Sequence, residues 1–209
     1  MVDKIDGCEE DMKVKNAMYV EKNIELNQEF FFAHPATKLR INNIYNTHFS
    51  SSPLWNLFGP GAGHIETSYN RSVKIMLDLP YATHRCFIEP LTGEKHIKRI
   101  LASRFLGFIE NIEKCGKKTV KMLMETAKQD VRSVTGSNFR NIMLLVGKTS
   151  ITTVRKDDAD KIKYFPIEED DCWKVDAIKE LIDVKNSILE VPGFEINELN
   201  EILSHLCTS

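Results

Sequence analysis

The stretch from Ile65 to Leu79 constrains the fold of this chain more than any other. At about 100° per residue, its apolar side chains fall on one side of a helix and its polar side chains on the other. The apolar side consists of Ile65, Tyr69, Val73, Met76 and Leu77. Pro80 lacks the backbone N–H group that a continuing helix would use, so it predicts the end of this helix. The stretch therefore predicts an amphipathic helix that packs one face against other elements.

Helical patterns recur along the remaining chain. The expected helices are Glu9 to Gln28, one opened by Pro35, Glu94 to Lys114, Lys117 to Val131, one that begins near Ser137 and is closed by Gly147, one whose first turn contains the acidic run at residues 168–171, and a last one after a turn at Val191-Pro192-Gly193. Gly59 to Gly63 is interpreted as a plain turn, because a phosphate-binding loop needs a preceding buried strand. The sequence thus predicts an all-α fold.

The cysteine pattern and the hydropathy exclude several classes of protein. Five irregularly spaced cysteines without a Cys-x-x-Cys pair indicate reduced thiols rather than a disulfide frame or a zinc knuckle. We expect no structural metal and no cofactor. The longest apolar run, Ile142 to Val146, is far too short to span a membrane, and the acidic N-terminus is unlike a signal peptide. These features predict an intracellular protein, in the nucleus or the cytoplasm, without membrane contact.

Charge is distributed unevenly along the chain. Residues 67–148 contain 15 Lys and Arg against 7 Asp and Glu, a net charge of +8. Residues 1–66 have a net charge of −3, from 6 basic and 9 acidic residues, and residues 149–209 have −7, from 7 and 14. A basic centre between acidic ends predicts a middle that faces a polyanion or is covered by the acidic tail of the same chain.

The predicted helix from Lys117 to Val131 has a row of cations on one side. Lys117, Lys121, Lys128 and Arg132 form this row, which Glu125 interrupts. Because phosphates recur along a nucleic-acid backbone, such a row could neutralise several of them and release counterions. An ordinary solvated lysine face would show the same pattern.

A second candidate site for a phosphate begins at Asp130. Ser137 and Asn138 are residue types that cap helices, and the N–H groups at the start of a helix attract anions. Arg132 and Arg140 flank them. The residues therefore predict a single-phosphate site, with an ordinary capped helix start as the alternative.

Several ordered segments resemble one family of proteins. They are the Trp-containing break Ser52 to Leu57, the run Tyr69-Asn70-Arg71-Ser72, the run Leu79-Pro80-Tyr81-Ala82-Thr83-His84-Arg85, and Asp130 to Ile142 with its Arg-Ser-x-Thr-Gly-Ser-Asn core. In this order they are similar to the region behind the polymerase palm in non-LTR (LINE-type) retrotransposon reverse transcriptases, especially jockey- and chicken-repeat-like elements. The resemblance extends over nearly the whole chain.

The resemblance implies three segments and one activity. Residues 1–34 would form an N-terminal helix leading into the bundle, residues 35–148 a thumb-like basic helical bundle, and residues 149–209 an acidic connector with C-terminal helices. A thumb grips the template–primer duplex, whereas the palm of the full-length RNA-directed DNA polymerase holds Mg²⁺ on a Tyr-x-Asp-Asp turn. Asp157 and Asp158 lack the required aromatic residue and are interpreted as a helix start. We therefore expect no catalytic residue in this chain.

The expected ligand is RNA, DNA or their hybrid, bound through its backbone without sequence specificity. The phosphate-binding candidates are Arg71, Lys74, Arg85, Lys117, Lys121, Lys128, Arg132, Ser137, Asn138 and Arg140. Tyr81 and His84 could stack on a sugar or base, although a loop aromatic packed against the core is the commoner case. Two other functions fit the same sequence: a helical protein-interaction module recruited from a retrotransposon, and a non-functional relic of one.

Overall fold

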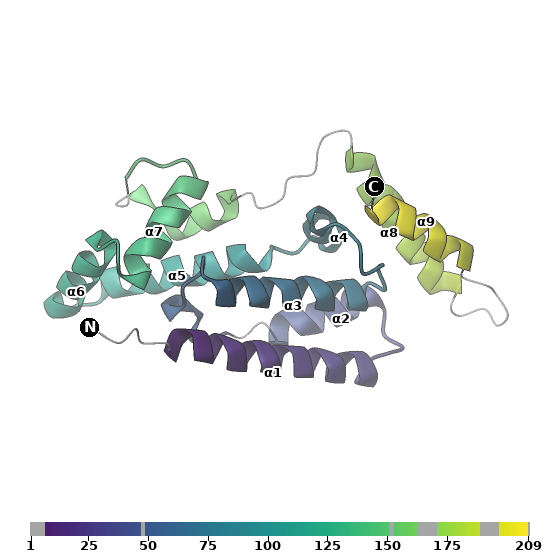
Figure 1. Ribbon diagram of the computed structural model, residues 1–209, viewed down its shortest axis with the longest axis horizontal. Helices are drawn as coiled ribbons and strands as arrows, with labels where there is room; N and C mark the ends of the chain where they lie inside the picture. The colour runs from purple at the N-terminus through teal and green to yellow at the C-terminus, as the bar shows by residue number, and fades with distance from the viewer. Residues whose placement is uncertain (1–6, 47–48, 151–152, 163–170, 189–196, 209) are drawn as a thin grey trace. The chain divides into compact units, whose positions relative to one another are not determined.

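The computed structural model describes residues 7–46, 49–150, 153–162, 171–188 and 197–208 (Figure 1). Every regular element among these residues is helical, so the prediction of an all-α fold is confirmed. The α-helices are α1 (Gly7–Glu29), α2 (Pro35–Ile41), α3 (Pro60–Met76), α4 (Ile88–Thr92), α5 (Ile97–Lys114), α6 (Lys118–Gln129), α7 (Val134–Leu145), α8 (Cys172–Ile188) and α9 (Asn197–Thr208). A π-helix, η1 (Asn42–Asn46), and three 3₁₀ helices, η2 (Ser52–Leu54), η3 (Arg85–Phe87) and η5 (Lys156–Lys161), complete them.

The chain divides into two compact units. Unit 1 comprises Met1–Met18, Phe49–Thr67 and His96–Tyr164, and unit 2 comprises Tyr19–His48, Ser68–Lys95 and Phe165–Ser209. The division falls within α1 and within α3. Both units are assembled from segments distant in sequence. The three consecutive segments that the resemblance implies, residues 1–34, 35–148 and 149–209, stay a prediction.

Unit 1 is built around the tryptophan of the break that precedes α3. Trp55 is 1% exposed, and its ring centroid lies 5.4 Å from that of Phe49. Its indole N–H donates a hydrogen bond to Asp11 Oδ2 at 2.7 Å, and the Ser51 hydroxyl donates to the same oxygen at 2.6 Å. The buried indole therefore has a polar partner, which burial of an N–H group requires.

Asn138 in α7 ties this break to the helices that follow. Its side chain is fully buried, with Oδ1 accepting from the Leu57 backbone N–H at 3.0 Å. Its Nδ2 donates to the Trp55 carbonyl oxygen at 2.7 Å. One amide thus satisfies two backbone groups that would otherwise be buried without partners.

The sequence predicted a turn at Gly59 to Gly63, but most of this glycine-rich stretch belongs to α3. Pro60 to Gly63 form the first turn of the helix, which proline favours because its missing N–H group has no intrahelical partner there. A Cβ atom at Gly61 would lie 2.9 Å from the Met12 terminal methyl, so glycine permits close approach to α1. The helix ends at Met76, four residues before Pro80, and Asp78 has a left-handed φ of 52°.

A buried charge cluster joins α3 to the start of α5. Glu66 Oε2 forms an ion pair with Lys98 Nζ at 2.7 Å, and Glu66 Oε1 lies 3.4 Å from His96 Nε2. His96 also caps α5, because its Nδ1 accepts from the Lys98 backbone N–H at 3.3 Å. An accepting Nδ1 has no proton, so the ring proton of the neutral tautomer lies on Nε2 and faces the glutamate.

This cluster predicts a loss of stability in acid. Burial acts to raise the pKa of Glu66, but its hydrogen bonds to His96 and Lys98 outweigh burial and lower the pKa from 4.5 to about 2. A depressed folded-state pKa stabilises the fold above pH 4.5, and this contribution is lost as the pH falls toward 2. The loss amounts to about 2–3 kcal/mol. Denaturant titrations between pH 6 and 2 should show a shallower decline for Glu66→Gln than for the wild type; equal declines would contradict the assignment.

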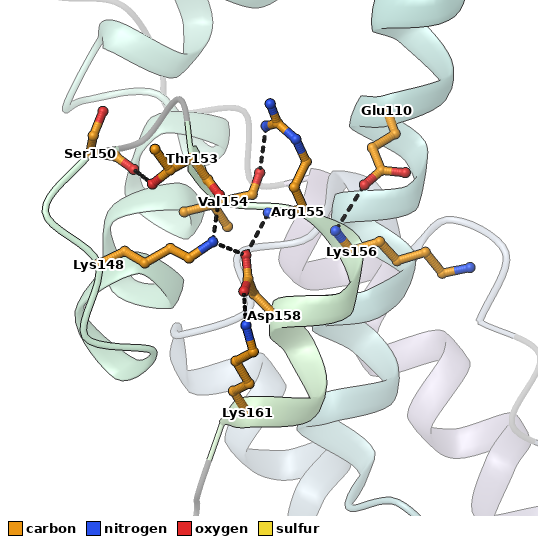
Figure 2. A network of polar contacts seen from close by, with 9 residues as sticks. All are labelled: Glu110, Lys148, Ser150, Thr153, Val154, Arg155, Lys156, Asp158 and Lys161. Carbon is orange, nitrogen blue, oxygen red and sulfur yellow. Dashed lines mark hydrogen bonds and ion pairs between the residues drawn. The ribbon is translucent and has the colours of Figure 1, made fainter.

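A second buried carboxylate, Asp158, stabilises η5 and the residues that precede it (Figure 2). Its Oδ2 accepts hydrogen bonds from Lys148 Nζ at 2.5 Å and from the Arg155 backbone N–H at 2.7 Å. Its Oδ1 forms an ion pair with Lys161 Nζ at 2.9 Å. These contacts hold the pKa of Asp158 far below its usual range, although burial alone would raise it. The interpretation of Asp157 and Asp158 as a helix start is confirmed, since η5 begins at Lys156.

Unit 2 packs aromatic and aliphatic side chains around Tyr19 of α1. The rings of Tyr19 and Tyr69 stack with centroids 6.4 Å apart, and Asn42 Nδ2 donates to the Tyr19 hydroxyl at 3.4 Å. The predicted carboxylate-rich helix start at residues 168–170 and the predicted turn at Val191-Pro192-Gly193 lie outside the described residues.

The C-terminal helices of unit 2 contact the segment that follows α3. Lys185 of α8 is buried, forming an ion pair with Asp78 Oδ2 and donating to Asn200 Oδ1 of α9 at 2.8 Å. The His84 backbone N–H donates to the carbonyl oxygen of Cys207 at 2.8 Å. The acidic tail is thus packed against the chain through specific contacts rather than charge alone.

Candidate nucleic-acid interface

Many cations of unit 1 are neutralised within the fold. Lys98 forms an ion pair with Glu66, and Lys148 and Lys161 both form ion pairs with Asp158. Lys128 contacts the carboxylates of Glu113 and Glu125, the latter at 3.1 Å. Such paired cations contribute little positive potential to the surface, so the candidate interface must come from the others.

Four lysines at the junction of α5 and α6 are exposed, and no carboxylate pairs with them in the part of the chain that the structure describes. We call Lys114, Lys117, Lys118 and Lys121 the lysine cluster. Within the described residues, none of their ammonium groups forms a hydrogen bond or an ion pair. The cluster occupies eight consecutive residues, with Lys114 ending α5 and the other three opening α6.

The start of α6 reinforces this positive potential. Helices usually place acidic residues in the first turn, where unpaired N–H groups carry a partial positive charge. No acidic residue lies in the first turn of α6, and the N-cap residue Lys117 makes no side-chain cap. Helix end and lysines therefore add fields of the same sign, which would attract an anion.

The structure retains part of the row of cations predicted along α6. Lys117 and Lys121 are exposed, and Arg132 is exposed in the loop beyond the helix. Lys128 does not fit the prediction, because it is 8% exposed and lies 5.3 Å from the centroid of the Phe139 ring. Its angular position on the helix matches that of its neighbours, but α5 and α7 cover this end of α6.

The predicted phosphate site near Ser137 and Asn138 has a different structure. Helix α7 is capped by Ser133, whose hydroxyl oxygen accepts from the Gly136 N–H at 2.9 Å, so Ser137 lies inside the helix. Asn138 is fully buried and bonded to backbone on both sides, which excludes phosphate contact. The Arg140 guanidinium donates to the Gln129 carbonyl oxygen at 3.2 Å. The alternative, an ordinary capped helix start, describes these residues.

The other predicted contacts all belong to unit 2, around the end of α3. Arg71 and Arg85 are exposed, and Lys74 donates to the Tyr81 carbonyl oxygen at 2.9 Å with its ammonium 5.8 Å from the centre of that ring. Tyr81 is 80% exposed and therefore not packed against the core. The His84 ring, also exposed, has Nδ1 3.0 Å from the sulfur of Cys86.

Helical spacing in the sequence predicts an apolar face on α6, made of Val120, Leu123, Met124, Ala127 and Val131, and this face is only partly covered. Val120, Met124 and Ala127 are half-buried, but Leu123 is 67% and Val131 60% exposed. Lys128, in the last turn of the helix, contacts Glu113 of α5 and Phe139 of α7, and Val131 follows the C-terminus of the helix. Periodicity identified the helix but not how much of its face the neighbours would cover.

Sequence reasoning missed Lys114 and Lys118 as candidate contacts. A wheel drawn for one helix at a time separates Lys114 from α6 and places Lys118 off the predicted row. The density of lysines along the chain was the available signal, because four of the eight residues from 114 to 121 are lysine.

Comparison with known protein families, with curated proteins and with solved structures found no match to this chain. Within the described ranges, no group of three or more His, Cys, Asp or Glu side chains is placed to hold a metal ion. Of the helices described, none combines the length and apolar composition that a membrane span requires.

Proposed function

We propose that this chain binds the sugar–phosphate backbone of nucleic acid without sequence specificity, through the lysine cluster and Arg132. The observation that supports this proposal is the concentration of exposed, uncompensated ammonium groups at the α5–α6 junction. Neighbouring carboxylates that could neutralise them, Glu113 and Glu125, are engaged by Lys128.

The chemistry of the cluster favours phosphate rather than base recognition. Lysine ammonium groups are compact point charges on flexible stems, suited to phosphates but without the fixed fork that arginine uses to recognise a base edge. Each phosphate neutralised releases counterions, so four lysines supply substantial salt-dependent affinity. RNA, DNA and RNA–DNA hybrid are therefore all expected ligands.

The resemblance noted in the sequence gives this activity a context. In a non-LTR retrotransposon reverse transcriptase, the thumb and the residues behind it grip the template–primer duplex. We assign this chain the same role, as a binding region that is not catalytic by itself. Mg²⁺ and phosphoryl transfer would belong to a palm, and we assign no residue of this chain to them.

Unit 2 supplies a second candidate contact region. Arg71 and Arg85 are exposed residues, and Tyr81 offers an exposed ring on which a base or sugar could stack. Although the C-terminal helices contact Asp78 and His84, these three side chains remain exposed. Helices α8 and α9 therefore leave Arg71, Arg85 and Tyr81 exposed.

The proposal is tested by removing the cluster and comparing the effect with an equal loss of charge elsewhere. Changing Lys114, Lys117, Lys118 and Lys121 to Gln should weaken binding to a labelled RNA–DNA hybrid by roughly 30-fold or more near physiological salt. A control variant with Lys22, Arg40, Lys156 and Lys179 changed to Gln has the same net charge and should bind within a few-fold of wild type. Equal losses in both variants would reduce the effect to net charge and refute the site.

One observation favours the second candidate function, a protein-interaction module. Phe31 and Phe32 of unit 2 are each 76% exposed and border a depression of about 670 Å³. Aromatic side chains are enriched at protein–protein interfaces, so an exposed pair of phenylalanines is typical of a protein-contact surface. Absence of any hybrid binding by the wild type at low salt would favour this candidate over the first.

A further inference from the structure

We infer that Lys128 is a positioning residue that keeps the lysine cluster positively charged by holding Glu113 and Glu125 away from it. This inference rests on the proposed function, because it explains how the cluster stays available to a polyanion. It replaces the direct phosphate contact that the sequence predicted for Lys128.

The geometry around Lys128 shows a cation turned inward. Its ammonium contacts Glu113 Oε1 across the α5–α6 packing and lies 3.1 Å from Glu125 Oε1 on its own helix. The Phe139 ring of α7 lies 5.3 Å away, at cation–π distance. Three helices thus direct two carboxylates and one aromatic ring at a single side chain that is 8% exposed.

Both carboxylates lie close to the cluster in the helical register. Glu125 is four residues after Lys121 on α6, the spacing at which oppositely charged side chains pair on a helix surface. Glu113 directly precedes Lys114 at the end of α5. If Lys128 were absent, Glu125 could pair with Lys121, and Glu113 would leave a second unpaired negative charge at the end of α5, next to the cluster.

The burial of Lys128 explains why Glu125 pairs with it rather than with Lys121. An ion pair in a partly buried site is stronger than one between exposed side chains, because water screens it less. Glu125 therefore pairs with the buried Lys128 three residues ahead rather than with the exposed Lys121 four residues behind. The net result is a surface patch whose neighbouring carboxylates are paired with Lys128 rather than with the lysines of the cluster.

The test compares two variants that lose one positive charge each. Lys128→Gln leaves two carboxylates without a partner, whereas Lys156→Gln removes an exposed lysine whose side chain has no carboxylate partner among the described residues. We expect Lys128→Gln to weaken hybrid binding about fivefold more than Lys156→Gln, and to elute from immobilised heparin at lower salt. Equal behaviour of the two folded variants would overturn the inference.

Rescue distinguishes freed carboxylates from a lost phosphate contact. Adding Glu113→Gln and Glu125→Gln to Lys128→Gln should restore binding and retention, and it also replaces the three charged groups by neutral amides that can hydrogen-bond. The matched variant, Lys128→Gln with Asp157→Asn and Asp160→Asn, has the same net charge and should not be rescued. Rescue by both pairs, or by neither, would contradict the inference.

Two readouts separate this inference from the proposed function. If the wild type fails to bind hybrid, the proposed function is wrong, but heparin retention still reports the field of the lysine cluster. If Lys128→Gln does not fold by circular dichroism, the comparison passes to the two triple variants, whose net charges are identical. Later elution of the Glu113 and Glu125 variant is then the expected result, and identical elution is the opposing one.

Discussion

Replacing Gly136 with alanine is expected to lower the free energy of unfolding by about 3 kcal/mol or more. Gly136 lies in the first turn of α7, where α6 ends against it. A Cβ atom there would be 2.1 Å from the Asp130 carbonyl oxygen and 2.9 Å from that of Ala127. Both are backbone atoms that cannot rotate away, so the loop between the helices would have to move. Denaturant-induced unfolding monitored by circular dichroism measures the effect.

The sign of this change distinguishes close approach from ordinary helix propensity. At an uncrowded helical position, alanine is more stable than glycine by roughly 0.5–1 kcal/mol. Gly63 in the first turn of α3 is such a position, because nothing lies within 4 Å of a Cβ built there. Gly63→Ala should therefore stabilise the protein. Stabilisation by Gly136→Ala as well would show that the α6–α7 corner is more open than the structure indicates.

Asn138→Ala is expected to destabilise the protein by about 3 kcal/mol. The substitution removes both hydrogen bonds of a fully buried amide and leaves the Leu57 N–H and the Trp55 carbonyl without partners. It also opens a small cavity in place of the buried amide. Because these bonds connect positions more than 80 residues apart, the loss should appear as cooperative unfolding at lower denaturant concentration.

Asn111→Ala provides the control for this prediction. Asn111 is an exposed residue of α5 whose side chain makes no hydrogen bond among the described residues. Its replacement should change the free energy of unfolding by less than about 0.5 kcal/mol. A similar small change for Asn138→Ala would mean that water or another side chain satisfies the Leu57 and Trp55 backbone groups.

Local sequence patterns predicted the elements whose determinants are themselves local. The apolar residues of α5 recur at helical spacing, and Pro35 opens α2 as expected. The start of α3 was missed because its glycines resemble a turn in sequence. Glycine at position 61 permits close packing against Met12, a contact between residues 49 positions apart that no local pattern reveals.

The candidate site could be predicted only in part, for a similar reason. Helical periodicity placed Lys117, Lys121 and Lys128 on the same side of α6. Whether a lysine on that side is exposed depends on which carboxylates and rings of other helices reach it. Of these three lysines, Lys128 is the one that Glu113 and Phe139 contact in the described part of the chain. Capping propensity likewise identified a helix start near Asn138 but could not show that the Trp55 segment would bind its amide.

The salt dependence of hybrid binding tests the central claim most directly. The logarithm of the affinity of the wild type should fall steeply and linearly with the logarithm of the salt concentration. Changing Lys114, Lys117, Lys118 and Lys121 to Gln should make that slope shallower by about three to four units, while the charge-matched control variant retains the wild-type slope. Identical slopes for the wild type and the cluster variant would show that the α5–α6 junction does not contact the nucleic-acid backbone.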